Sequence, residues 1–212
     1  MKLTVLHFTP YEPMIRAARI SHDSLEKMDT KNNILGENDK KLLQTLIKQE
    51  HFSVLEHIVY TFEISDISRA LLQELARHRL ISMTVQSTRF TLKKHAKQNK
   101  IDFIEGVGLT EEDEKKIQEL LEYIQKRLGE GASNDVIKYL IPEAVKTKLI
   151  MTVNARELSH IINLRIRSNA LPEFQGLATF LLIAAHTVHP ELWGMLIEKF
   201  NYPVQIKQTP PE

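Results

Sequence analysis

Two kinds of apolar pattern alternate along this 212-residue chain, and their order constrains the fold more than any other feature. Residues 3–8, 57–64 and 148–153 are rich in β-branched and aromatic side chains or alternate in polarity, which is typical of strands. Helical spacing of apolar residues predicts helices over 13–20, 38–48, 67–76, 110–129, 133–140, 155–167, 172–188 and 191–200. The mixture predicts an α/β fold of the α+β type, in which helices flank a small, mostly antiparallel sheet.

Capping residues set the expected starts of several helices. Asn38 or Asp39 is expected to cap the second helix, and Ser65 or Asp66 the third. Thr110 and Asp113 form a variant of the capping box. No repeat or linker divides the chain, so residues 1–202 are expected to form one domain and residues 203–212 a flexible C-terminal tail.

Composition narrows the classes of function. The chain has 28 basic and 27 acidic residues, which argues against a general nucleic-acid or membrane-surface binder. It contains no cysteine, which excludes disulfides, thiolate metal sites and a Cys nucleophile. No signal peptide or membrane span is evident, so we expect a soluble cytoplasmic protein without nucleic-acid or membrane partners.

A dense set of hydrogen-bond donors follows the helix predicted over 67–76. Residues 77–89, RHRLISMTVQSTR, contain three Arg, one His and two Ser. Guanidinium groups bind phosphate or carboxylate in a bidentate manner and stay charged, so this segment predicts an anion site. For Arg77 and Arg79 alone, cations that complement the helix dipole are an equally good explanation. No glycine-rich phosphate loop occurs, so side chains would hold the phosphates of a bound nucleotide.

A second polar segment lies in the helix predicted over 155–167. At about 100° per residue, Arg156, His160, Asn163 and Arg167 share one face, while Arg165 falls on the apolar stripe. An exposed polar face would explain Arg156 and His160 equally well. An Arg on an apolar stripe must find a partner or extend to solvent. If Arg156 and Arg165 are both functional, we expect them to serve different ligands, or different sites across a subunit interface.

The histidines do not form a convincing metal site in the sequence. His51, Glu56 and His57 suggest a metal site, but no further ligand lies at suitable spacing, and a strand starting at Glu56 would point Glu56 and His57 apart. We therefore favour a polar contact or helix-end role for them and predict no metal. His95 is assigned to a solvated loop. Structural roles are assigned to His186, His189 and Trp193.

These segments together resemble the flavin-dependent thymidylate synthase family. The family motif is Arg-His-Arg, two residues, Ser, four residues, then Ser-x-Arg, and it is matched without a gap by Arg77, His78, Arg79, Ser82, Ser87 and Arg89. Residues 16–21, 51–62 and 152–165 resemble the family's early helix, its His segment with the following strand, and its late helix, in the same order.

The resemblance implies a homotetramer, with active sites shared between subunits, that converts dUMP to dTMP. Methylenetetrahydrofolate would supply the one-carbon unit, FAD would carry the hydride, and NADPH or NADH would reduce the flavin. The absence of cysteine agrees with this chemistry, because the unrelated classical thymidylate synthases form a covalent Cys adduct and this chain cannot.

The resemblance also implies residue roles. Flavin contacts are expected from His51, Ser53, Glu56, Arg77, His78, Arg79, Leu80, Asn154, Arg156 and His160. Contacts with dUMP are expected from Glu74, Arg77, Gln86, Ser87, Arg89, Lys138 and Arg165. Arg89 would bind the phosphate. Arg165 would be the catalytic residue, holding the uracil edge, where a fixed positive charge can stabilise negative charge developing on the ring.

The chain departs from the family pattern in a few places. Thr84-Val85 replaces a common Asn-Glu, Phe90 a Tyr, Lys138 a phosphate-binding Arg, and Glu74 a Gln that contacts dUMP. Lys138 keeps the charge but loses the bidentate geometry. Two other functions remain open: an RNA- or nucleotide-binding module that uses residues 77–89, and a metal-dependent phosphohydrolase built on the His51 segment.

Overall fold

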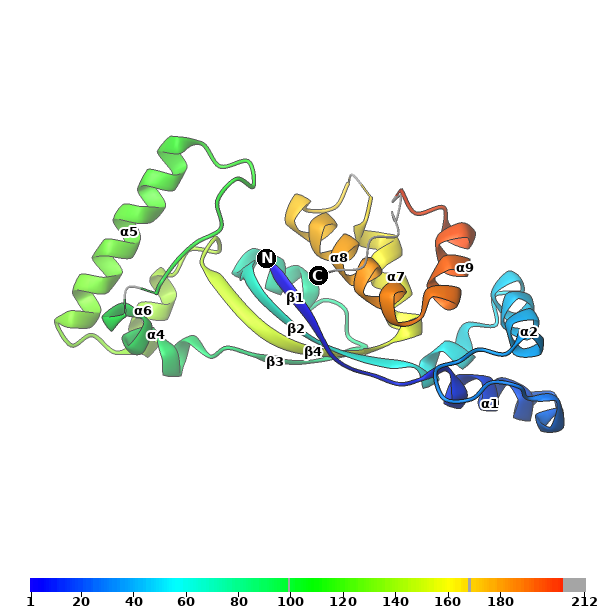
Figure 1. Ribbon diagram of the computed structural model, residues 1–212. Coiled ribbons are helices and arrows are strands. Elements are labelled where there is room, and N and C mark those ends of the chain that lie inside the picture. Colours follow the sequence, from blue (N-terminus) through cyan, green and yellow to red (C-terminus); the bar gives the residue numbers. More distant parts are fainter. Residues whose placement is uncertain (99, 168, 204–212) are drawn as a thin grey trace. The chain divides into compact units, whose positions relative to one another are not determined.

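The computed structural model describes residues 1–98, 100–167 and 169–203 (Figure 1). The elements are β1 (Lys2–Phe8), α1 (Tyr11–Ser21), η1 (Leu25–Lys27), α2 (Glu37–Lys48), η2 (Phe52–His57), β2 (Val59–Ser68), α3 (Arg69–Leu75), β3 (Ile81–Val85), α4 (Thr88–Lys97), α5 (Glu111–Gly129), α6 (Asn134–Ile137), η3 (Lys138–Leu140), β4 (Lys146–Asn154), α7 (Ala155–Arg165), α8 (Pro172–Val188) and α9 (Pro190–Phe200). Within the described residues, the strands form a four-stranded antiparallel sheet in the order β1-β2-β4-β3. The predicted combination of helices with a small antiparallel sheet is confirmed.

The chain divides into two compact units, each built from separate segments. The first unit comprises residues 1–2, 64–78 and 83–150, and the second comprises residues 3–63, 79–82 and 151–212. Strands β2, β3 and β4 each contribute residues to both units. The predicted tail falls almost wholly outside the described residues, which end at Pro203.

The core of the first unit forms around α5. Its N-terminus carries the predicted capping box, in which the Thr110 hydroxyl accepts from the Asp113 amide at 3.2 Å and the Asp113 carboxylate accepts from the Thr110 amide at 3.0 Å. The predicted apolar face of α5 is confirmed, because Leu121, Ile124 and Leu128 are buried. They belong to a cluster whose other buried members are Leu92, Phe103, Ile137 and Val145.

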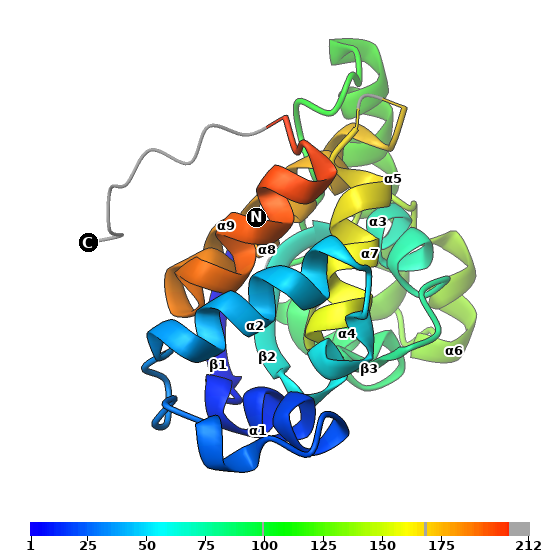
Figure 2. The same ribbon diagram turned by 90° about the vertical axis from the view of Figure 1, so that its right-hand side faces the viewer.

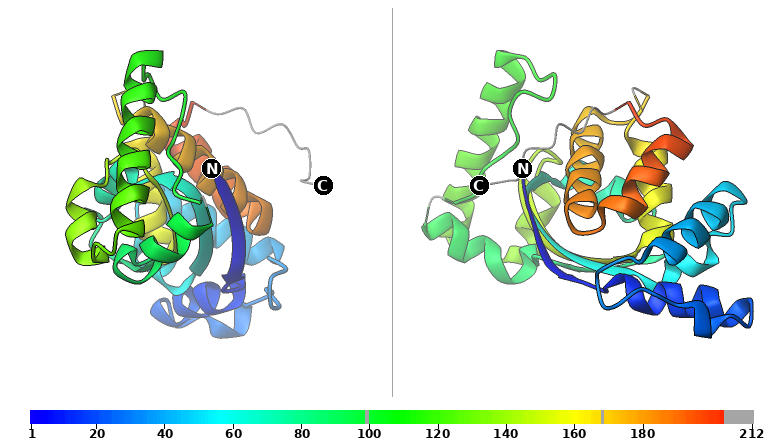
Figure 3. Two further views of the ribbon diagram at one scale, coloured as in Figure 1. Left: turned by 90° about the vertical axis from the view of Figure 1, so that its left-hand side faces the viewer. Right: turned by 45° about the vertical axis from the view of Figure 1, so that its right-hand side comes forward.

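The core of the second unit is aromatic. Helix α7 packs against α8, α8 against α9, and α9 against α2, as the views in Figures 2 and 3 show. Trp193 is fully buried, as predicted, and its indole nitrogen donates to the Tyr60 hydroxyl at 2.8 Å. The same hydroxyl lies 2.8 Å from Nδ1 of His189, which has no exposed surface. His189 therefore has the structural role that the sequence indicated.

Several predicted helix starts are wrong, for local reasons. Helix α1 begins at Tyr11 and not at Pro13, because proline is tolerated within the first turn. Helix α2 begins at Glu37 after Gly36, so neither Asn38 nor Asp39 caps it. Strand β2 continues through Asp66, whose φ of 58° is left-handed, and Ser68 caps α3 by accepting from the Leu71 amide.

Asp39 has a different role from the predicted cap. Its carboxylate is fully buried, lies 2.7 Å from Nε of Arg19, and accepts from the backbone amides of Asp29 and Thr30. Burial alone would raise the pKa of Asp39, but hydrogen bonds from Thr30 and Arg19 and from the backbone outweigh it and hold the pKa below its usual value. This buried pair joins α1 to the start of α2.

Besides the short 3-10 helices η1 and η2, the sequence missed one strand, β3, and one α-helix, α4. Apolar and polar residues do alternate along β3, where Ile81, Met83 and Val85 are half-buried and Ser82 is exposed. Helix α4 has a single buried residue, Leu92, so its apolar stripe is too narrow to stand out from a Lys-rich sequence. The loop predicted between Arg89 and Lys100 is therefore mostly helix.

Candidate active site

The residues expected to bind flavin and those expected to bind dUMP fall largely in different units. The second unit contains all of the expected flavin contacts except Arg77 and His78. The first unit contains all of the expected dUMP contacts except Arg165. Each unit is therefore described with its own set.

In the second unit, several expected flavin contacts line one cavity of about 610 Å³, which we call the Arg156 cavity. Its walls are formed by Phe52, Glu56, Leu80, Asn154, Arg156, Glu157, Ser159, His160, Asn163 and Phe200. Polar groups at the start of α7 thus face apolar side chains from η2, α9 and the segment before β3. Ligand pockets commonly have this combination and a volume of roughly 300–1,000 Å³.

A charged pair and an amide define the polar side of the Arg156 cavity. Arg156 donates from Nη1 to Oε1 of Glu56 at 2.5 Å, although both side chains are about half exposed. Asn154 is the N-cap of α7, and its Oδ1 accepts from the Glu157 amide at 2.8 Å. Because the amide oxygen is used in this bond, the NH2 group of Asn154 remains a donor for a ligand.

A second carboxylate lies beneath the same cavity. Glu157 is largely buried, and burial raises the pKa of its carboxyl group above the usual value, with His160 acting in the opposite direction. One turn after Arg156, His160 also lines the cavity, as does Asn163, so the predicted shared face of α7 is confirmed for these three residues. Arg167, also predicted on that face, bonds to Asn163 and is not among the lining residues.

His51 and Ser53 do not line the Arg156 cavity. His51 is the N-cap of η2 and Ser53 lies within it, and both are exposed. The prediction that a strand begins at Glu56 or His57 is wrong, because η2 continues to His57 and β2 starts at Val59. Within the described stretches of the chain, no three His, Asp or Glu side chains are arranged to hold a metal ion.

In the first unit, the end of the motif forms the start of a helix. Ser87 is the N-cap of α4, and its side chain makes no capping hydrogen bond. Arg89, in the first turn, pairs with Asp135 of α6 at 3.2 Å. The first amides of a helix have no intrahelical partner and favour anions, so backbone groups join these side chains in a possible phosphate site. The sequence analysis predicted that side chains alone would hold the phosphate.

Lys138 lies close to this pair along the chain. It begins η3, three residues after Asp135, so the two occupy neighbouring positions on successive helical turns. The side chain of Asn134 donates to the Arg89 carbonyl at 2.6 Å and holds α6 against α4. The structure therefore brings Arg89 and the segment containing Lys138 into adjacent elements.

The remaining expected dUMP contacts in the first unit are less closely grouped. Arg77 follows α3 and lies 4.0 Å from the carboxylate of Glu74, with most of its side chain exposed. His78 is buried and donates its amide to the Leu75 carbonyl. Gln86 is fixed by its backbone, whose amide donates to the Lys148 carbonyl at 2.9 Å.

In the second unit, one partner of Arg165 is an aromatic ring. Its guanidinium lies 4.8 Å from the ring centroid of Phe174, at the start of α8. Phe174 is fully buried, and Arg165 is half-buried at the end of α7. A cation–π contact of this kind orients the planar guanidinium without neutralising its charge.

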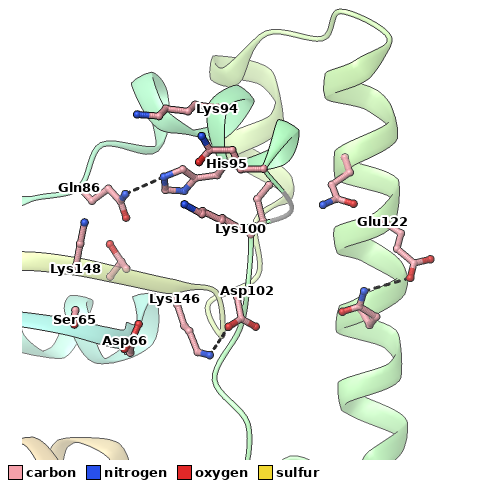
Figure 4. Close-up of a pocket in the computed structure, with 15 residues that line it drawn as sticks. Ser65, Asp66, Gln86, Lys94, His95, Lys100, Asp102, Glu122, Lys146 and Lys148 are labelled. Atoms are coloured by element: carbon pink, nitrogen blue, oxygen red, sulfur yellow. Dashed lines mark hydrogen bonds and ion pairs between the residues drawn. The ribbon is translucent and has the colours of Figure 1, made fainter. Parts of the chain in front are cut away.

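The sequence missed a second cavity, which lies in the first unit and which we call the lysine groove (Figure 4). It has a volume of about 920 Å³ and is lined by Ser65, Asp66, Gln86, Lys94, His95, Gln98, Lys100, Ile101, Asp102, Gln118, Glu122, Gln125, Lys146, Thr147 and Lys148. The assignment of His95 to a solvated loop is wrong, because it lies in α4 and its ring contacts Gln86. Leu92 and Ala96, four residues apart, were the available helical signal.

Comparison with known proteins shows the family. The family profile described as thymidylate synthase complementing protein matches residues 4–191. The flavin-dependent thymidylate synthase of Campylobacter jejuni (strain RM1221) is 39% identical to this chain, and the match covers 94% of this chain and 99% of that protein. The flavin-dependent thymidylate synthase of Wolinella succinogenes is also 39% identical, and the match covers 91% of this chain and 97% of that protein. Thymidylate synthase X from Helicobacter pylori, crystallised with FAD and dUMP, superposes with a TM-score of 0.80 at 31% identity and covers 93% of this chain and 100% of that one.

These matches, together with the complete motif at residues 77–89, define an enzyme class. The chain belongs to the flavin-dependent thymidylate synthase family. No helix in residues 1–98, 100–167 or 169–203 is long and apolar enough to cross a membrane.

Proposed function

We propose that this enzyme converts dUMP to dTMP with FAD as its bound cofactor. The observation that carries the proposal is the Arg156 cavity, which gathers Glu56, Leu80, Asn154, Arg156 and His160 in one unit. The resemblance to the family predicted flavin contacts at these residues independently of any cavity. Relatives named as flavin-dependent thymidylate synthases and a solved relative with FAD and dUMP support it.

The chemistry of the Arg156 cavity fits a flavin dinucleotide. The guanidinium of Arg156 and the free amide of Asn154 suit phosphate oxygens and ring carbonyls, and Phe52, Leu80 and Phe200 provide apolar surface for an aromatic ring system. When bound, the flavin supplies the hydride. The residues that would hold it are His51, Ser53, Glu56, Arg77, His78, Arg79, Leu80, Asn154, Arg156 and His160. To bind the ligand, Arg156 must either give up its contact with Glu56 or contact Glu56 and the ligand at the same time.

The first unit would bind dUMP. Arg89, Ser87 and the first amides of α4 would hold the phosphate, with the charge of Lys138 nearby and Gln86, Arg77 and Glu74 as further contacts. Arg165, held by Phe174, would keep its charge beside the uracil ring and stabilise the negative charge that develops when the C5 proton leaves. The pairing of Arg89 with Asp135 keeps its guanidinium oriented before substrate arrives.

The co-substrates are proposed on the same basis. Methylenetetrahydrofolate would supply the carbon, and NADPH or NADH the reducing equivalents. No covalent cysteine adduct forms on this chain, which has no cysteine.

We also propose a homotetramer in the cytoplasm, with active sites shared between subunits. Three large apolar side chains directly follow expected basic contacts and are strongly exposed: Leu80 is 72%, Phe90 79% and Tyr139 86% accessible. Exposed apolar surface next to a binding residue is typical of an interface. Molar mass in solution, measured by light scattering, would be four times that of the chain; a monomeric mass for the active enzyme would contradict the shared sites.

The reaction is tested with the purified enzyme, FAD and dUMP labelled with tritium at C5. The protein should show visible flavin absorption and release tritium to water when methylenetetrahydrofolate and NADPH or NADH are present. A protein that binds no flavin and releases no tritium after FAD is added would contradict the proposal.

A further inference from the structure

Three lysine side chains that form no ion pair with another described residue line the lysine groove. Lys94 comes from α4, Lys100 from the segment after it, and Lys148 from β4 (Figure 4). Among the described residues, no carboxylate forms an ion pair with any of the three. Lys146, two residues before Lys148 on the same strand, does have a partner, because its Nζ lies 2.5 Å from Oδ2 of Asp102.

The acidic groups of the groove are already engaged. Asp102 binds Lys146, as described, and Asp66 lies 3.7 Å from the ammonium group of Lys2. Glu122 accepts a hydrogen bond from the Gln118 amide at 3.3 Å, within α5. Asp66 and Asp102 are thus each paired with another lysine, whereas Glu122 keeps its negative charge. Lys94, Lys100 and Lys148 together outweigh that one carboxylate, so the groove is positive.

The dipole of α4 does not explain the cluster. Cations at a helix C-terminus complement the partial negative charge there, and α4 ends with Lys94, His95 and Lys97. Lys97, however, does not line the groove, while Lys100 and Lys148 line it from outside the helix. Lys100 stays close to this helix end, because its amide donates to the His95 carbonyl at 2.9 Å, but Lys148 comes from β4 and is not explained by the dipole.

The charges of these lysines affect the pKa of His95. Partial burial, followed by the charges of Lys148, Lys94 and Lys100, holds the pKa of its imidazole below the usual value. Its Nε2 lies 3.3 Å from the amide nitrogen of Gln86. Because an amide NH2 group can only donate, Nε2 accepts, which leaves the proton of the neutral ring on Nδ1.

We propose that the lysine groove is a binding site for a small anion with two or more negative charges, carried by phosphate or carboxylate groups. Lys94, Lys100 and Lys148 would bind it as point charges, and the amides of Gln98 and Gln118 would donate hydrogen bonds. The cavity, at about 920 Å³, has room for such a molecule. Nucleic acid is a poorer occupant, because the whole chain has a net charge of only +1.

This site differs from the one proposed for the phosphate of dUMP. His95 follows the N-cap Ser87 by eight residues, which is about 12 Å along α4. Gln86 is near both, so the two must be separated experimentally. The anion site does not depend on thymidylate synthesis, because its lysines have no part in that proposal.

Binding of pyrophosphate and of citrate would be measured by titration calorimetry on the flavin-loaded enzyme at constant ionic strength. An Arg89→Gln background removes the proposed dUMP phosphate site. In that background, Lys94→Gln with Lys148→Gln should weaken the tighter anion by about tenfold or more. The matched control, Lys93→Gln with Lys97→Gln, removes the same charge from the same region outside the groove and should change the affinity by less than about twofold.

A second readout comes from the His95 ring resonances. Anion binding should raise the pKa of His95, because a negative charge next to the imidazole favours its protonated form. Preference for pyrophosphate identifies a phosphate ligand, and preference for citrate a polycarboxylate. Equal weakening by both double variants, no binding at millimolar anion, or an unchanged His95 titration would overturn the proposal. Absence of thymidylate synthesis by the wild-type enzyme, with anion binding intact, would contradict only the proposed function.

Discussion

The Arg156 cavity and the lysine groove differ in whether their cationic side chains are already paired with a carboxylate. In the first, the principal cation is already paired with Glu56, the walls are partly apolar, and the surrounding unit has an aromatic core. In the second, three lysines lack partners among the described residues and the lining is polar. A cation that is already paired is oriented before a ligand arrives. In a cluster of unpaired lysines, by contrast, the repulsion between the ammonium groups is relieved only when an anion binds. The contrast suggests a specific cofactor cavity in one unit and a more permissive anion site in the other.

The largest expected effect concerns the one dUMP contact that belongs to the second unit. Arg165→Ala should reduce dTMP formation by about 10²- to 10³-fold, the usual cost of losing a group that stabilises developing charge. Flavin absorption should persist, because Arg165 does not line the Arg156 cavity. Turnover with [5-³H]dUMP and the visible spectrum measure the two effects separately.

Arg167→Ala is the matched control for that change. Arg167 lies two residues beyond the end of α7, and its guanidinium bonds to Asn163. Turnover should stay within a few-fold of the wild type. If both variants lost activity equally, or if Arg165→Ala lost its flavin, the role assigned to Arg165 would be wrong.

Two histidines, one in each unit, offer a contrast in pH dependence. Burial, opposed by Glu191, lowers the pKa of His189 to about 4, and Nε2 of its ring has no hydrogen-bond partner among the described residues. The unfolded chain takes up this proton near pH 6.5, so between about pH 6.5 and 4 it binds more protons than the folded state. Stability should therefore fall with decreasing pH in this window, by up to about 3 kcal/mol.

Urea unfolding followed by Trp193 fluorescence measures this effect at a series of pH values. His189→Asn, which can still cap α9, should lower stability at pH 7 but flatten its dependence between pH 6.5 and 4. His95→Asn serves as the comparison from the first unit, since its ring faces an open groove and should contribute much less. An unchanged pH profile in His189→Asn would show that other groups dominate acid unfolding.

A smaller effect is expected where the chain departs from its family. Lys138→Arg restores the bidentate group and should strengthen dUMP binding by a few-fold, because a guanidinium fork matches phosphate geometry better than an ammonium group does. Lys126→Arg, on the exposed surface of α5, is the control. Equilibrium binding of dUMP to the two variants decides; equal affinities would mean that Lys138 does not contact the phosphate.

The sequence predicted the second unit better than the first, and the reason is physical. Helices α7, α8 and α9 bury wide apolar stripes, so their periodicity is strong. Helix α4 buries only Leu92 and β3 is five residues long, so neither produces a hydrophobic periodicity strong enough to be recognised from the sequence. The resemblance to the family predicted binding roles for Arg89 and Arg156 from residue order alone. It gave no indication of the lysine groove, because Lys94, Lys100 and Lys148 come together only through the fold.

The central claim is that one unit supplies most of the flavin contacts and the other most of the dUMP contacts. The direct test is equilibrium binding of FAD and of dUMP to Arg156→Leu and to Arg89→Gln, measured side by side with the wild type. The account predicts a crossed result: Arg156→Leu weakens FAD by about tenfold or more with dUMP affinity largely kept, and Arg89→Gln does the reverse. Loss of both ligands in both variants, or loss of FAD in Arg89→Gln alone, would contradict it.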